Sequence, residues 1–357
     1  MNTQYRQFKE LIEEVDVRNV NGAISDLWGV SIDKKFIRSV ANIIGTDLTK
    51  YKVVSRNQFV CSLMQVSRDE KIPIDRWDSE NDIIVSPAYK VFKVKDSSIV
   101  LPEYLNLWFR RSEFDREASY YGVGGVRGSL EWEDFCEMAL PVPELVEQQE
   151  IVDAYNDIER RIALKRKIND NLESQALTLF KHSYEEFDES ELVSGTVSDF
   201  GEFIRGKNLT AAEMRSGSIP VISAGIEPSG FHNEYNVSSP SITISGSGVN
   251  AGYVSYHAEN IWASDCSYNN TVKLIRCLYL LLKINQSQIS DMQKGTAQPH
   301  VYPKEVNPLE IKYPPFETLD KLESKLIPIF DNIYNSLIEI QSLQEAKKVF
   351  LTTISSR

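Results

Sequence analysis

The stretch with the clearest chemical potential is YGVGGVRGS (Tyr121–Ser129), which holds four glycines within seven residues. A glycine loop that binds a dinucleotide follows a strand, opens a helix and has an acidic residue about 20 positions later. Here the glycines follow a helix-like segment, and the residues after them soon reach LPVP (Leu140–Pro143). This context favours a turn over a nucleotide-binding loop.

Three other short motifs lack the residues that their chemistry needs. ISGSGVNAG (Ile244–Gly252) has no Lys-Ser/Thr ending of a phosphate-binding loop. YPPF (Tyr313–Phe316) begins with Tyr, where an amino-methyltransferase needs Asp, Asn or Ser to accept a hydrogen bond from the target amino group. NPLE (Asn307–Glu310) does not match this methyltransferase motif either. These motifs give no support for ATP binding or for methyl transfer by this chain.

The remaining candidates for catalysis or metal binding are scattered along the chain. The histidines and cysteines show neither ligand spacing nor a CxxC pair; they are His182, His232, His257, His300, Cys61, Cys136, Cys266 and Cys277. No Ser-His-Asp or paired-carboxylate arrangement emerges, and EWED (Glu131–Asp134) is typical of a solvated helix start. We therefore expect a chain with no catalytic residues, no metal and no cofactor of its own, in a reducing cytoplasm.

Composition sets wider limits. The 357 residues suffice for two or three domains, and 42% hydrophobic with 25% charged residues is ordinary for a globular protein. No apolar run approaches the ~18 residues of a membrane span, and the polar, acidic start predicts no secretory signal. The net charge of −12 argues against extensive phosphate contacts. However, residues 17–143 carry 17 basic and 18 acidic side chains, which allows a locally basic groove completed by partner subunits.

A long internal repeat organises these segments. A shift of 171 residues without gaps aligns apolar residues of one helical phase, such as Ile151 with Leu322 and Ile162 with Ile333. In the same register, Gly124 meets Gly295 and Pro143 meets Pro314. The agreement of the helix phase, the glycine and the proline indicates a true duplication.

Each repeat ends in a long helix. Glu147–Phe180 has no Gly or Pro and has apolar residues at spacings of three and four, which predicts a helix roughly 50 Å long. Its narrow apolar stripe needs a helical partner, and the matching segment Leu319–Ser355 is the candidate. Pro328 lies within that segment, so we expect a kink or a short break there. Alternatively, both helices could simply cover the domains.

The part before each helix reads as mixed α/β. In the first repeat, YKVVSRNQFVCSL and DIIVSPAYKVFKV are strand-like, and a helix is expected from near Pro102 over LPEYLNLWFRRSEFDREAS. In the second repeat, SIPVIS, SITISG, GYVSYH and IWASD predict short strands separated by turns. The two copies differ greatly here, which suggests two related tasks on two targets.

At this point the residues resemble a known family, the specificity (S) subunits of type I restriction-modification systems. LPVPELVEQQEIVDAYNDIERRIALKRKINDNLESQALTLF (Leu140–Phe180) is similar to their central region. QKGTAQPHVYPKEVNPLEIKYPP (Gln293–Pro315) looks like the end of one of their target recognition domains. Three segments look like the body of that domain: Thr196–Asn208, IPVIS (Ile219–Ser223) and Ile242–Asp265. The second repeat departs from the pattern, because Thr318-Leu319 replaces the Glu147-Gln148 signature. The first repeat also follows GTAQPH only loosely, as GGVRGS.

The resemblance implies an α+β (mixed α/β) fold with two globular target recognition domains separated by two long antiparallel helices, in a tandem pseudo-twofold repeat. We expect the first recognition domain over 1–143, with an N-terminal helix, and the first spacer helix over 144–187. The second recognition domain would span 188–315 and the second spacer helix 316–357.

The resemblance also implies a non-catalytic subunit that reads DNA in a prokaryotic cytoplasm. Each recognition domain would read one half of a bipartite, asymmetric site on double-stranded DNA. The helices would set the spacing and dock two methyltransferase (M) subunits, which bind S-adenosylmethionine. A separate motor and nuclease (R) subunit would cleave.

The side chains that could contact DNA lie in the loops of the two domains. Asn and Gln can pair with adenine, Arg and Lys with guanine or phosphate. Our candidates in the first domain are Tyr89, Lys90 and Arg127. Those in the second are Arg205, Lys207, Asn208, Ser247, Asn250, Lys294, Gln298 and His300.

Two other functions stay open on the sequence alone. One is a stand-alone DNA methyltransferase or nuclease whose motifs are disguised, and the other is a helical scaffold whose domains bind protein rather than DNA. Binding of S-adenosylmethionine by the isolated chain would favour the first, and the absence of any sequence-selective DNA complex would favour the second.

Overall fold

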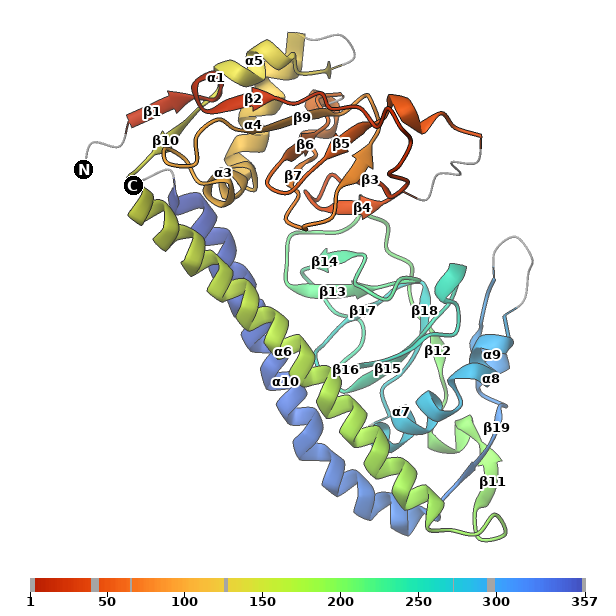
Figure 1. Ribbon diagram of the computed structural model, residues 1–357. Helices are drawn as coiled ribbons and strands as arrows, with labels where there is room; N and C mark the ends of the chain where they lie inside the picture. The colour runs from red at the N-terminus through yellow and green to blue at the C-terminus, as the bar shows by residue number, and fades with distance from the viewer. Residues whose placement is uncertain are drawn as a thin grey trace. The chain divides into compact units, whose positions relative to one another are not determined.

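The computed structural model describes residues 4–39, 45–64, 66–124, 128–271, 273–293 and 299–354 (Figure 1). The chain forms two compact units, Met1–Ile162 with Ser342–Arg357, and Ala163–Gln341. Each unit holds a strand-rich part and a segment of each long helix. We call the strand-rich parts the first head (residues 4–142) and the second head (residues 193–313).

The first head contains two four-stranded sheets. One has the order β2 (Ile12–Glu14), β9 (Lys90–Val94), β6 (Phe59–Cys61) and β7 (Ile74–Arg76), all antiparallel. The other has the order β4 (Phe36–Arg38), β3 (Leu27–Val30), β8 (Ile83–Val85) and β5 (Lys52–Val54), with β3 and β8 parallel. Short helices α2 (Val66–Asp69), α3 (Pro102–Phe109), α4 (Ser112–Tyr121) and α5 (Trp132–Glu137) accompany them.

The second head repeats most of this topology. Its first sheet has the antiparallel order β12 (Ile204–Arg205), β18 (Cys266–Asn269), β15 (Ser241–Ser245) and β16 (Val254–His257). Its second has the order β14 (Gly230–His232), β13 (Ile219–Ile222) and β17 (Trp262–Ala263), with β13 and β17 parallel. Helices α7 (Ile275–Ile284), α8 (Gln286–Asp291) and α9 (Pro303–Val306) follow. The two heads therefore share strand order and direction in the first sheet and in three strands of the second, where β5 has no counterpart among the described strands.

The duplication is visible in the bounds of the elements. Strand β10 (Ala139–Val142) pairs with β1 (Gln4–Gln7), and β19 (Glu310–Tyr313) pairs in the same way with β11 (Val193–Thr196). The end of β19 lies 171 residues after the end of β10. The long helices α6 (Leu145–Glu185) and α10 (Phe316–Thr353) begin at the same offset. The repeat that the sequence predicted is thus a structural one.

One expectation about helices is wrong, and a second is wrong in part. The N-terminal helix is reduced to α1 (Phe8–Leu11), four residues between β1 and β2. Here strand pairing with β10 and β9 and burial of Phe8 and Leu11 override the local helical pattern. The second expectation concerned Pro328: α10 continues through it without a break, whereas a kink there stays a prediction. The proline removes one backbone hydrogen bond, and the buried side chains of Leu326 and Phe330 on either side hold the helix to the core of its unit.

The long helices pack against each other in both units, and they run antiparallel. In the first unit, Lys347 Nζ lies 2.6 Å from Glu159 Oε1, and Phe350 further along α10 packs on Tyr155 earlier in α6. In the second unit, Lys165 Nζ lies 2.5 Å from Glu339 Oε2, and Ala176 and Phe180 share a buried cluster with residues of α10. None of the helices in the described ranges combines the length and apolar character that a membrane crossing needs.

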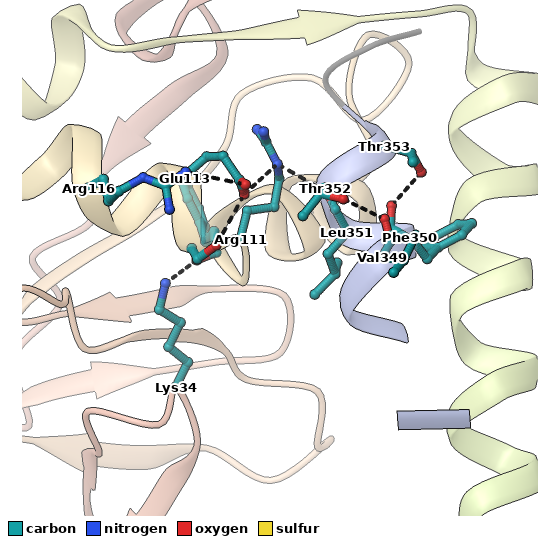
Figure 2. A network of polar contacts seen from close by, with 11 residues as sticks. Lys34, Arg111, Glu113, Arg116, Val349, Phe350, Leu351, Thr352 and Thr353 are labelled. Carbon is teal, nitrogen blue, oxygen red and sulfur yellow. Dashed lines mark hydrogen bonds and ion pairs between the residues drawn. The ribbon is translucent and has the colours of Figure 1, made fainter. Parts of the chain in front are cut away.

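The helix expected from Pro102 is divided, and the division places a buried arginine. The backbone of Arg111 is extended between α3 and α4, and its side chain stacks on Trp108, with the guanidinium carbon 3.9 Å from the ring centroid. Arg111 Nε donates to the carbonyl oxygen of Leu351 in the last turn of α10 at 3.2 Å (Figure 2). Glu113 lies 3.8 Å from the same guanidinium. The first head therefore binds the C-terminal turn of α10.

Candidate nucleic-acid interface

Three loops of the second head converge on one carboxylate. Arg205, at the end of β12, forms an ion pair with Asp265, which lies between β17 and β18. The other carboxylate oxygen of Asp265 accepts a hydrogen bond from the hydroxyl of Ser247, just after β15. Arg205 and Ser247 are two of the predicted DNA contacts, and the structure brings them to the same acid.

An aromatic pair completes this cluster. The guanidinium carbon of Arg205 lies 5.5 Å from the ring centroid of Tyr302, directly before α9. The ring of His300, another predicted contact, stacks on Tyr302 with centroids 5.6 Å apart and an interplanar angle of 11°. Gly246 leaves room for this arrangement, because a side chain there would overlap the guanidinium of Arg205. We call Arg205, Asp265, Ser247, His300 and Tyr302 the arginine cluster.

Lys207 and Asn208 continue the turn that begins at Arg205. The amide of Lys207 donates to the carbonyl of Ala263 at 2.9 Å, and its carbonyl accepts from the indole of Trp262 at 2.9 Å. The side-chain oxygen of Asn208 accepts from the hydroxyl of Ser264 at 3.5 Å. Both side chains are exposed. The turn is therefore held along β17, with two polar side chains presented to the solvent.

The loop after β15 lies beside the arginine cluster. The amide of Gly248 donates to the carbonyl of Pro299 at 3.0 Å, and Ser247 forms an isolated β-bridge with His300. Asn250, a further predicted contact, ends the short 3-10 helix η5 (Gly248–Asn250) in this loop. Lys294 and Gln298 lie outside the described residues, as does Gly295.

The first head has a related arrangement around Lys90. Lys90 Nζ, at the start of β9, lies 2.8 Å from Glu14 Oε1 on the neighbouring strand β2. The same ammonium lies 5.3 Å from the ring centroid of Trp132, the first residue of α5. Lys90 and Trp132 also line a hollow of about 380 Å³ with Ser129, which occupies the position of His300 in the repeat. This head thus also holds a cation between a carboxylate and an aromatic ring.

The other predicted contacts of the first head lie elsewhere. Tyr89 is half-buried and packs against the core cluster that contains Val30 and Trp77. Arg127 is outside the described residues. Of the glycines around it, Gly128 has a positive φ of 75° and packs so closely on Ser67 that a side chain would overlap its hydroxyl. This fits the interpretation of the segment as a turn.

The residues that complete both clusters escaped the sequence interpretation. Asp265, Tyr302, Glu14 and Trp132 carry no motif, and each reaches its cation across a sheet or from a distant loop. The available signal was positional, since Tyr302 and Trp132 stand beside segments that the repeat aligned.

Two of the histidines, His232 and His257, take structural positions. His232 Nδ1 accepts a hydrogen bond from the amide of Arg215 at 3.0 Å, and His257 Nε2 lies 2.7 Å from the Thr243 hydroxyl. Burial lowers the pKa of His257 to about 4 and raises the pKa of Cys266 to about 12. Within the described ranges, no group of three or more His, Cys, Asp or Glu side chains is arranged to hold a metal ion.

Comparison with known families agrees with this duplicated architecture. The family described as type I restriction modification DNA specificity domain matches twice, over residues 77–174 and 189–348. Each match runs from a head into the long helix that follows it. The chain belongs to this specificity family.

Individual members of the specificity family are distant in sequence. The MjaIX specificity subunit of Methanocaldococcus jannaschii is 24% identical over 315 residues, which cover 76% of this chain and 72% of that protein. The HindI specificity subunit of Haemophilus influenzae is 24% identical over 198 residues, covering 54% of this chain and 42% of that protein. The crystal structure of the S subunit from M. genitalium has the same fold, with a TM-score of 0.53 at 16% identity, covering 99% of this chain and 96% of that one.

Proposed function

We propose that this chain is the non-catalytic, DNA-reading subunit of a type I restriction-modification complex. Each head binds one half of a bipartite, asymmetric site on double-stranded DNA. The paired helices set the distance between the half-sites and dock two methyltransferase subunits. Those partners carry S-adenosylmethionine, and restriction subunits join through the assembled complex.

The duplicated heads carry this proposal. Seven strands of each head have the same order and direction, yet the side chains at matching places differ in charge, size and hydrogen-bonding groups. A duplicated scaffold with different surface side chains suits two targets of the same kind and different sequence. Two DNA half-sites fit this description, because they share the phosphate backbone and differ in the base edges through which sequence is read.

The long helices support the role of a spacer. At 41 residues, α6 has a length of roughly 60 Å, which is enough to separate half-sites by one or more turns of ~34 Å. Within each unit the helix pair is fixed by apolar contacts and by ion pairs such as Lys347–Glu159 and Lys165–Glu339. Such a pair resists bending better than a single helix and can hold a fixed distance.

Methylation-site sequencing tests the proposal directly. Cells that carry this chain with its methyltransferase subunit should acquire adenine methylation at one bipartite motif. Cells that carry the methyltransferase subunit alone should not. Methylation without a defined motif, or unchanged methylation when this chain is deleted, would contradict the proposed role.

Binding of S-adenosylmethionine separates this role from that of a stand-alone methyltransferase. The isolated chain should bind no S-adenosylmethionine at micromolar concentrations in calorimetry, while the assembled complex should bind it. Clear binding by the isolated chain would instead identify a methyltransferase.

A further inference from the structure

We propose that Arg205 and Lys90 are base-reading side chains at matching places in the two heads, each reading a guanine in its own half-site. This inference rests on the proposed function and adds the residues and the base. In each case a carboxylate and an aromatic ring hold the cation before DNA arrives.

The two places match by topology. Strand β12 corresponds to β2, and β18 corresponds to β9, because both sheets have the same order. Arg205 lies on β12 and pairs with Asp265 directly before β18, whereas Glu14 lies on β2 and pairs with Lys90 at the start of β9. The cation and the carboxylate have exchanged strands. The aromatic ring comes from the start of the same short helix, α9 with Tyr302 or α5 with Trp132.

A shared backbone contact lies just before the two aromatic residues, which stand one position apart in the 171-residue register. The amide of Val301 donates to the carbonyl of Gly246 just after β15, at 3.2 Å. The amide of Leu130, 171 residues earlier, donates to the carbonyl of Leu63 just after β6, at 2.9 Å. The same connection therefore brings Tyr302 and Trp132 to the same edge of their sheets.

Both ion pairs are exposed enough to reach a ligand and confined enough to be ordered. The side chains of Arg205 and Asp265 are 37% and 30% exposed, and those of Lys90 and Glu14 are both 34% exposed. A cation already held in place loses less side-chain entropy when it binds than a free one does. Partly exposed ion pairs contribute little to stability, so stability alone does not explain the repeated arrangement.

The bound carboxylate favours a base edge over a phosphate as the target. Contacts to phosphate depend on net positive charge, and a cation that is already paired with a carboxylate has little net charge. Guanine instead presents two acceptors, O6 and N7, to directed donors in the major groove. Asp265 binds one Nη atom of Arg205, which leaves other guanidinium N–H groups for a bidentate contact.

The experiment compares methylation motifs of the co-expressed complex for four variants. Arg205→Gln should relax one G·C pair of one half-site, with a loss of about 10- to 100-fold in discrimination against other base pairs. Lys90→Gln should relax one pair in the other half-site. Asp265→Asn should lower binding of the cognate site about tenfold without changing its sequence, because Asp265 positions Arg205. Arg205→Lys, which keeps the charge, should retain binding and lose part of the discrimination.

Each head offers a matched control. Lys93 pairs with Glu13, which lies directly opposite it on the same two strands, at 3.1 Å. Arg215 in the second head is exposed and lies 3.9 Å from Glu234. Lys93→Gln and Arg215→Gln should leave both half-sites unchanged. Co-purification of every variant with the methyltransferase subunit verifies folding and assembly.

Salt dependence distinguishes base from phosphate contact. Arg205→Gln should leave the slope of log K against log salt unchanged, whereas loss of a phosphate contact lowers it by about 0.9. An assembled Arg205→Gln complex with an unaltered motif, or with a reduced slope, overturns the inference while the wild-type bipartite motif still stands. A wild-type complex without any defined motif overturns the proposed function itself.

Discussion

The side-chain oxygen of Gln148 accepts a hydrogen bond from the backbone amide of Leu101 at 2.8 Å, which joins the start of α6 to the start of α3. The side-chain amide of Gln148 also donates to the carbonyls of Ile99 and Pro143, at 2.9 and 2.8 Å. The residue is fully buried. In the second repeat the matching position is Leu319, which is also fully buried. The first repeat therefore fills this buried position with a hydrogen-bonded amide, and the second fills it with an apolar side chain.

This difference predicts that the repeats cannot exchange the two residues. Gln148→Leu should destabilise the first unit by about 3 kcal/mol, because it removes the hydrogen-bond partner of one amide and two carbonyls at a part-buried site. Urea unfolding measures the effect. Gln149→Leu, at an exposed neighbouring position, should change the free energy of unfolding by no more than ~0.5 kcal/mol. Equal effects of the two variants would show that the hydrogen bonds of Gln148 do not stabilise the unit.

Arg111 gives a second prediction, which concerns the C-terminal turn of α10. Arg111→Met should cost about 2 kcal/mol, because it removes the hydrogen bond to Leu351 and the stacking on Trp108. Residues after Ser342 should become more sensitive to limited proteolysis. Arg116→Met, which replaces an exposed arginine on the neighbouring helix α4, is the control. Unchanged protection of the C-terminal residues in Arg111→Met would show that the contact does not hold the helix end.

The long elements of the fold were predictable because their sequence signals are local. An apolar stripe over α6 and α10 identifies each helix, and the shared register identifies the repeat. The common topology of the heads was not predictable. Their strands have two to five residues, too few for a period to emerge, and their order depends on pairings between distant segments such as β2 with β9.

Part of the candidate site was predictable, because some of its sequence signals are also local. Arg205, Ser247 and His300 stand in turns that the sequence marks with glycine and asparagine, and they do meet in the arginine cluster. Asp265 was missed because nothing in its neighbourhood shows that it faces Arg205, 60 residues earlier. Tyr302 was missed because an aromatic residue beside a short helix is usually part of a core.

The helix pair gives a third prediction. Ile162 on α6 is buried, with 4% of its surface exposed, whereas Ile158 is only partly buried. Ile162→Asp should therefore cost about 3 kcal/mol or more, and the double change with Ile158→Asp should prevent assembly with the methyltransferase subunit. Leu164→Asp, at an exposed position two residues away, should leave the free energy of unfolding nearly unchanged. An Ile162→Asp protein as stable as the Leu164→Asp protein would show that this face of α6 is not packed.

His257 gives a prediction about pH. Burial lowers its pKa to about 4, from about 6.5 in an unfolded chain, so between these values the unfolded state binds the extra proton. The contribution of neutral His257 is fully present above pH 6.5 and is lost as the pH falls towards 4. We expect a loss of about 1–3 kcal/mol, towards the lower value because the side chain keeps part of its surface exposed.

Urea unfolding at pH 7.5 and 4.5 should show a smaller difference in the free energy of unfolding for His257→Gln than for wild type. The exposed His182→Gln variant should keep the full wild-type difference. The same pH dependence in all three proteins would show that His257 is not the group responsible.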